Sequence, residues 1–183
     1  MKKYYAMMLT LVLGCAGLAA HAQKDPMVGG AEMYPTKNIV ENAMNSKDHT
    51  TLVAAVKAAG LVETLEGPGP FTVFAPTNEA FDKLPAGTVD TLLKPENKAA
   101  LTKILTYHVV AGKVSSKDLQ KMIKDGGGKA EIKTLEGGTL TASIHGGKIV
   151  LTDEKGGMST VTIANVYQSN GIIHVVDTVL MPN

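Results

Sequence analysis

The sequence predicts a domain of the α+β class, and three observations support that prediction. Between residues 38 and 124, apolar residues recur at helical spacing. From Ala130 onward they alternate with polar residues, as they do in half-buried strands. Two glycine pairs, Gly137-Gly138 and Gly146-Gly147, fall where two-residue hairpin turns need positive φ. In a chain of 183 residues we therefore expect one domain, an antiparallel meander of strands with helices packed against it.

The helical half starts after an aperiodic segment, residues 23–35, which contains two prolines and two glycines and is expected to be a linker. Residues 38–44 and, more strongly, residues 49–59 place apolar side chains on one helical stripe. Gly60 ends the second of these helices, because glycine readily adopts the left-handed conformation that closes a helix. Residues 61–65 are expected to add one further helical turn.

A buried strand followed by a capped helix is expected next. Residues 71–75 are rich in aromatic and β-branched side chains and end at Pro76, a residue that interrupts a strand. Thr77 is well placed to cap a helix over residues 78–83, because its hydroxyl can accept from an amide of the first turn.

Two more helices precede the strand half. Residues 96–106 follow Pro95, which suits the first turn of a helix. Residues 115–124 begin with Ser115 and Asp118, spaced as in a capping box. The expected strands are residues 131–135, 139–145, 148–152, 160–166 and 172–180.

Residues 1–22 have the organisation of a secretory signal peptide. Two lysines precede an uncharged apolar stretch over residues 4–20, and an A-x-A cleavage site ends at Ala22. The apolar stretch is at the lower limit of length for a membrane span, so no stable span is expected. Cleavage near Ala22 predicts a secreted or periplasmic protein. Lipid anchoring at Cys15 is the less favoured alternative, because Leu-Gly before the cysteine matches a lipoprotein box poorly.

The charged residues make a nucleic-acid partner unexpected. All 18 basic residues are lysines, and the formal net charge is +1. Proteins that read nucleic acid normally use arginine, for bidentate contacts to guanine and for stacking on bases. A loose strip of lysines is most often a solvated face, and its alternative role is contact with an acidic polysaccharide or with lipid head groups. The lysines of the strip are Lys117, Lys121, Lys124, Lys129 and Lys133.

No catalytic motif is present in the sequence, which lacks the patterns of nucleophile elbows, zinc proteases, redox dithiols and phosphate loops. His174 and Asp177 come nearest to a base and its orienting acid. They are three residues apart on a predicted strand, so their side chains should point to opposite faces. His108 shares no metal-ligand spacing with the other histidines. We therefore expect no enzyme activity, cofactor or metal, and we expect His174 to be buried and bonded to backbone groups.

Three segments in order resemble the fasciclin family. Residues 71–81, FTVFAPTNEAF, resemble its first signature box, and residues 170–182, NGIIHVVDTVLMP, resemble its second. Between the boxes, residues 105–110 followed by Gly112 are similar to the central Tyr-His segment of the family. The resemblance covers residues 36–183 and identifies the chain as a single-domain, exported bacterial member. It implies a wedge of two short β-sheets with helices packed along one side.

The resemblance also implies extracellular binding or adhesion without enzyme chemistry. In animal matrix members, the Tyr-His segment and an Asp-Ile pair ahead of the second box are linked to integrin contact. Tyr107 and His108 match the first of these, whereas Asn165 and Val166 stand in place of the Asp-Ile pair. These four residues form the candidate interaction segment. Because Tyr107 and His108 lie between apolar core residues, we expect both to be largely covered.

Two functions follow as expectations. The first is an exported binding module that contacts a cell-envelope or matrix protein or polysaccharide. The alternative is a carrier for a small apolar ligand such as a carotenoid or a lipid, because some fasciclin-like proteins resemble carotenoid-binding proteins with an apolar groove. A carrier would need an exposed apolar groove of several hundred Å².

Overall fold

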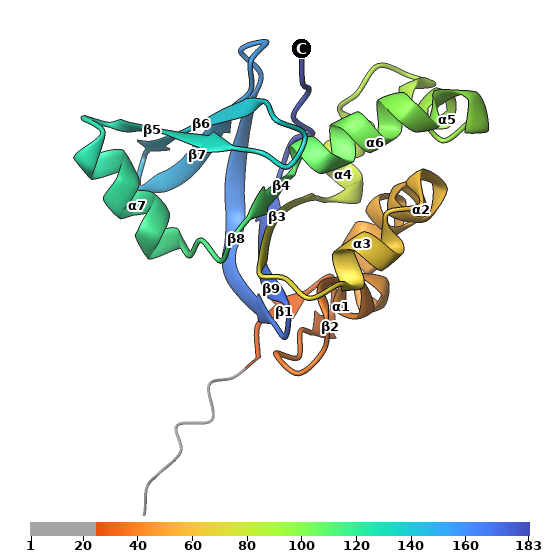
Figure 1. Ribbon diagram of the computed structural model, residues 1–183, viewed down its shortest axis with the longest axis horizontal. Helices are drawn as coiled ribbons and strands as arrows, with labels where there is room; N and C mark the ends of the chain where they lie inside the picture. The colour runs from red at the N-terminus through yellow and green to blue at the C-terminus, as the bar shows by residue number, and fades with distance from the viewer. Residues whose placement is uncertain (1–24) are drawn as a thin grey trace, which may run out of the picture.

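The two signature segments lie side by side at the centre of the fold in the computed structural model, which describes residues 25–183 (Figure 1). Strand β3 (Phe71–Pro76) runs parallel to β9 (Gly171–Val176), with Phe71 opposite Gly171 and Pro76 opposite Val176. Strand β4 (Val109–Ala111) pairs antiparallel with the other edge of β3. All six residues of β9 are buried, as expected of a strand with parallel pairing and both faces covered.

The strands after β4 form the expected antiparallel meander, and the ladder runs in the order β4-β3-β9-β8-β7-β6-β5. Strand β8 belongs to both halves of this ladder. Its first residues pair with β7, and the rest pair with β9 through two register shifts near Ile163. Such shifts bend and twist a strand, so the ladder divides at β8 into the two short sheets of the expected wedge. The remaining strands are β1 (Met27–Val28), β2 (Ala31–Glu32), β5 (Lys129–Lys133), β6 (Thr139–His145), β7 (Lys148–Thr152) and β8 (Met158–Gln168).

Helices cover the two sheets unequally (Figure 1). Helices α1 to α6 gather beside β3 and β9 and enclose a first hydrophobic core with Val73, Val166 and Ile173. Helix α7 lies against β5, β6 and β7 and closes a second core around Leu119 and Leu140. The helices are α1 (Ile39–Asn45), α2 (Thr50–Ala59), α3 (Val62–Glu66), α4 (Asn78–Asp82), α5 (Thr88–Leu92), α6 (Lys98–Tyr107) and α7 (Ser116–Asp125), with 3-10 turns at Lys47–His49 and Pro95–Asn97.

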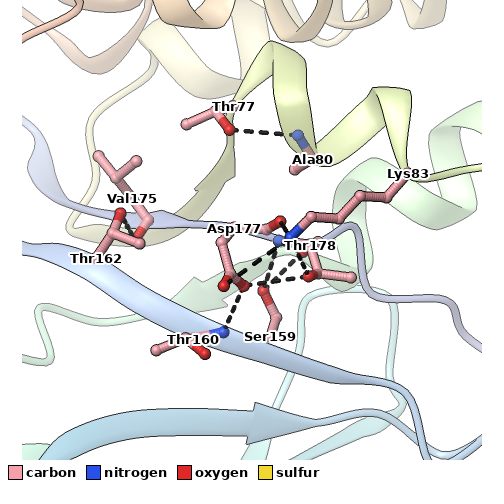
Figure 2. A network of polar contacts seen from close by, with 9 residues as sticks. All are labelled: Thr77, Ala80, Lys83, Ser159, Thr160, Thr162, Val175, Asp177 and Thr178. Carbon is pink, nitrogen blue, oxygen red and sulfur yellow. Dashed lines mark hydrogen bonds and ion pairs between the residues drawn. The ribbon is translucent and has the colours of Figure 1, made fainter.

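The expected helix caps are confirmed. The Thr77 hydroxyl accepts from the Ala80 amide at 3.3 Å (Figure 2). The Ser115 hydroxyl accepts from the Asp118 amide at 3.3 Å, while the Asp118 carboxylate accepts from the Ser115 amide at 2.9 Å. Gly60 ends α2 with a φ of +73°. Each cap satisfies a backbone group that a helix end leaves unpaired.

The expected linker over residues 23–35 is wrong for its described part. Strands β1 and β2 form a small hairpin within it, and the Met33 amide donates to the Pro26 carbonyl at 3.0 Å. Val28 and Met33 are 3% and 2% exposed and belong to the first core. Two apolar residues among glycines and prolines show no periodicity, so the sequence pattern carries no signal for a packed hairpin.

Three other expectations are corrected by the structure. Gly137-Gly138 is not a two-residue turn, because the loop between β5 and β6 spans residues 134–138. Strand β4 and helix α5 were not expected, and both are too short for a periodic pattern. The last strand stops at Val176 rather than at residue 180.

A polar network explains why β9 stops there (Figure 2). The Asp177 carboxylate accepts from the Thr160 amide at 2.8 Å and from the Thr178 hydroxyl at 3.1 Å. The Ser159 hydroxyl donates to the Thr178 carbonyl at 2.7 Å and accepts from its amide at 3.1 Å. Lys83, just after α4, donates to the Asp177 carbonyl at 2.5 Å. The network joins the second signature segment and the end of α4 to β8, and side-chain bonds take over from the ladder after the Asp177 amide, which donates to the Thr160 carbonyl at 3.2 Å.

Candidate functional site

Tyr107 is the last residue of α6, and its ring lies in the second core with no exposed surface. Its hydroxyl donates to the Thr139 carbonyl at 2.8 Å and accepts from the Glu154 amide at 3.3 Å. These bonds join the end of a helix to the start of β6 and to the loop between β7 and β8. Burial raises the pKa of the Tyr107 hydroxyl to about 12. The expectation that Tyr107 is covered is therefore confirmed.

His108 follows Tyr107 and is 2% exposed. Its Nε2 accepts from the Leu180 amide at 3.0 Å, so the proton is on Nδ1, which donates to the Ile104 carbonyl at 2.9 Å. The neighbouring amide, that of Met181, donates to the buried Asp153 carboxylate at 2.9 Å. Burial lowers the pKa of His108 to about 4. This neutral histidine therefore holds the carboxyl-terminal segment against α6.

Asn165 lies in the second register shift of β8, between Ile163 and Val166, and has a φ of +60°. Asparagine tolerates this left-handed conformation better than most residues. Its side-chain oxygen Oδ1 accepts from the Ser116 amide at 2.8 Å, and its side-chain nitrogen Nδ2 donates to the Ser116 hydroxyl at 2.6 Å. Asn165 thus satisfies an unpaired amide at the start of α7 and fixes α7 to β8.

His174 is fully buried, as expected, and it bonds to backbone groups on both sides of the contact between Asn165 and α7. Its Nδ1 accepts from the Asn165 amide at 3.3 Å, and its Nε2 donates to the Val114 carbonyl at 2.9 Å. Asp177 bonds instead to Thr160 and Thr178, so the two residues do not form a base and its orienting acid. His174 therefore anchors the loop that leads into α7.

The structure does not bring the four candidate contact residues together on one surface. Tyr107 is buried in the second core and Val166 in the first, and His108 is buried beside residues of the first core. Asn165 is half-buried and faces an open groove of about 920 Å³, which we call the Asn165 groove. The groove lies between the β1–β2 hairpin, the loop entering α7 and the end of β8. Its lining residues are Asp25, Pro26, Met33, Pro35, Lys113, Lys117, Ala164, Asn165, Tyr167, Gln168 and Ser169.

Sequence reasoning missed most of this groove. Lys113 and Tyr167 carried no motif, and Lys117 was one member of a longer lysine strip. The one usable signal was the position of Asn165, two residues before Tyr167 and close to the second signature segment.

An apolar pocket of about 40 Å³ lies elsewhere, between α1, α2, α3 and β3. Val40, Leu52 and Val73 are among the side chains that line it, and its lining is almost entirely apolar. A pocket of this size is far below the several hundred Å³ of an ordinary small-molecule site.

Comparison with known proteins decides the family. The model of the Fasciclin domain matches residues 47–182. The chain belongs to the fasciclin family. The domain pair of the insect cell adhesion molecule fasciclin I shares the fold, with a TM-score of 0.70 at 20% identity over 79% of this chain. The chain spans 51% of that structure, about half of its length.

Bacterial relatives are more similar in sequence. Protein sll1483 of Synechocystis is 48% identical over 160 residues, covering 87% of this chain and 82% of that protein. The immunogenic protein MPB70 of Mycobacterium bovis is 37% identical, covering 92% of this chain and 80% of that protein. The cell surface glycolipoprotein MPB83 of the same species is 38% identical, covering 92% of this chain and 70% of that protein. The comparisons give no indication of catalysis.

The predictions for the amino terminus lie outside the described residues: the signal peptide over residues 1–22, cleavage near Ala22 and lipid anchoring at Cys15. Within residues 25–183, no helix is long and apolar enough to cross a membrane.

The burial of Tyr107 predicts a role in stability. Tyr107→Phe removes two hydrogen bonds and should lower the free energy of unfolding by about 1 kcal/mol. Tyr107→Ala also leaves a cavity and should cost about 3 to 5 kcal/mol. Tyr34→Phe is the matched control, because the Tyr34 hydroxyl donates to Glu32 at an exposed site, and it should stay within about 0.5 kcal/mol. Urea denaturation measures all three, and a Tyr107→Ala protein as stable as the parent would contradict the structural role.

The buried histidines predict acid sensitivity. Burial holds the pKa values of His49, His108 and His174 below their usual range. Between about pH 6.5 and pH 4 the unfolded chain therefore binds more protons than the folded chain, and stability falls as the pH falls through this window. His108 alone should account for about 3 kcal/mol of this loss, from a pKa near 6.5 when unfolded.

Denaturation at several pH values tests this expectation. His108→Gln should be less stable at pH 7 and should show a smaller loss between pH 6.5 and pH 4, because glutamine does not titrate. His145→Gln, at the exposed end of β6, is the control and should follow the parent. An unchanged pH dependence in His108→Gln would contradict the assignment of a buried neutral imidazole.

Proposed function

We propose that this fasciclin domain is an exported, non-enzymatic binding module that attaches to the cell envelope or surrounding matrix through the Asn165 groove. The observation that carries the proposal is the position of Asn165. Of the four candidate contact residues, it is the one that reaches the surface, and it lines the groove. The groove is also large enough to receive a segment of a polymer, since its volume is about 920 Å³.

Location at the cell surface is supported by two independent points. Residues 1–22 have the pattern of an export signal. The relative MPB83 is a cell surface glycolipoprotein and covers 92% of this chain. An envelope or matrix component, protein or polysaccharide, is therefore the proposed partner.

The proposal predicts that blocking the groove weakens attachment. Ser169→Trp places a large ring at an exposed lining position whose side chain makes no hydrogen bond within residues 25–183. Binding of the exported protein, labelled at its carboxyl terminus, to native cell envelopes should weaken about tenfold, equivalent to about 1.4 kcal/mol. Thr64→Trp, on the exposed face of α3 away from the groove, is the control and should bind like the parent. Equal attachment of both variants, with unchanged melting temperatures, would contradict the groove as the contact face.

A second candidate function is transport of a small apolar ligand, favoured by the apolar lining of the pocket beneath α1, α2 and α3. The volume of about 40 Å³ does not hold a carotenoid, so loading would require these helices to move outward. Organic extraction of the exported protein, followed by mass spectrometry, distinguishes the two functions. One apolar molecule per chain would support the carrier, and a clean extract would support the binding module.

A further inference from the structure

The loop that forms one wall of the Asn165 groove is fixed by buried groups. The Thr72 hydroxyl donates to the Gly112 carbonyl at 2.7 Å and accepts from the Val114 amide at 2.9 Å. His174 then holds the Val114 carbonyl, and Asn165 holds the Ser116 amide. Residues 112–116 are therefore bonded to the rest of the fold at Gly112, Val114 and Ser116.

Two lysines project from this fixed wall. Lys113 lies between the anchored residues Gly112 and Val114, and Lys117 is in the first turn of α7. Both lysines are exposed and line the groove. Within residues 25–183, neither forms an ion pair with a carboxylate. The single acidic residue of the lining, Asp25, leaves an excess of positive charge.

An aromatic ring lies beside these charges. The Lys113 ammonium group is 5.2 Å from the centre of the Tyr167 ring. Tyr167 is half-buried, and its backbone pairs with Ile172 of β9, so the ring is carried by the central ladder. Next to it, Asn165 and Ser169 supply amide and hydroxyl groups to the groove. Positive charge, a ring face and small polar groups thus occur in one depression.

We propose that the Asn165 groove binds an anionic polysaccharide, with Lys113 and Lys117 contacting its acidic groups and Tyr167 contacting the apolar faces of its sugar rings. This inference rests on the proposed function, because it names the chemistry of the partner at the same groove. The two lysines without an ion-pair partner within residues 25–183 and the small polar groups beside them favour an acidic polysaccharide over a protein, whose contacts normally centre on a buried apolar anchor in a fitted pocket. The lack of arginine disfavours a nucleic acid.

Calorimetric titration of the exported protein with an oligomer of mannuronic acid tests the proposal. At about 50 mM salt, where screening is weak, the parent protein should bind the oligomer, and added salt should weaken binding. The double variant Lys113→Gln, Lys117→Gln should bind about tenfold less tightly and should lose most of the salt dependence. Lys124→Gln is the matched control, since Lys124 is exposed at the far end of α7 and does not line the groove, and it should match the parent.

The aromatic contact has its own pair of variants. Tyr167→Phe keeps the ring and should retain binding, whereas Tyr167→Leu removes it and should weaken binding about fivefold. Thermal melting accompanies each titration. If Tyr167→Leu unfolds, the comparison of the Lys113→Gln, Lys117→Gln double variant with Lys124→Gln still tests the proposal, because these substitutions alter exposed side chains alone.

Four results would overturn the proposal: no binding of the acidic oligomer, equal binding of a neutral glucose oligomer, equal loss in Lys124→Gln, or tighter binding of polyglutamate. The last result would identify an acidic protein partner. Failure of the proposed function is distinguishable from these results. If the acidic oligomer does not bind but Ser169→Trp still weakens envelope attachment, the groove is the contact face and the ligand class alone is wrong.

Discussion

The parallel pairing of β3 with β9 is the constraint on which the rest of the structure depends. It brings together segments that are 100 positions apart, and a pairing of such long range must be stabilised by burial on both faces. Val73 faces the first core and Phe74 the second, so each half of the molecule contributes to holding the pair. Phe74 lies opposite His174 in the ladder, and the two rings stack with centres 5.7 Å apart. At the start of the pairing, Gly171 approaches so closely that an added Cβ would lie 2.1 Å from the Phe71 carbonyl oxygen.

Buried polar groups connect this central pair to segments that lie outside the sheet. His108 and Asp153 bind the amides of the carboxyl-terminal segment, whereas His174 binds the loop that enters α7. A buried polar group is costly unless it is hydrogen-bonded, so each of these contacts also specifies where its partner segment must lie. The wall of the Asn165 groove is therefore positioned from the core, and not by contacts at the surface.

Much of the fold was predictable from the sequence, because long periodic segments and capping residues report on local structure. The helices around residues 49–59 and 115–124 and the meander after Ala130 are examples. The β1–β2 hairpin was not predictable, because Val28 and Met33 are apolar for a tertiary reason and have no periodic neighbours. The early end of β9 depends on Asp177 meeting β8, a contact that has no local signature.

The candidate site was predictable to a smaller extent. The sequence suggested that Tyr107 and His108 are covered, because apolar residues flank them on both sides. It placed Asn165 in the candidate set through a family resemblance. It could not show that Asn165 lines the same groove as Lys113 and Lys117, since the register shifts in β8 and the anchored loop are tertiary features. Residues that meet at this groove are thus separated by about 50 positions in the chain.

The β1–β2 hairpin determines how the groove is presented. Asp25 and Pro26 line the groove, so the described part of the chain begins at its rim. Asn183 lies at the opposite end of the molecule in Figure 1. A fluorescent fusion or sensor-chip linkage at the amino-terminal side would crowd an incoming polymer, whereas the same attachment at Asn183 leaves the groove facing outward into the medium.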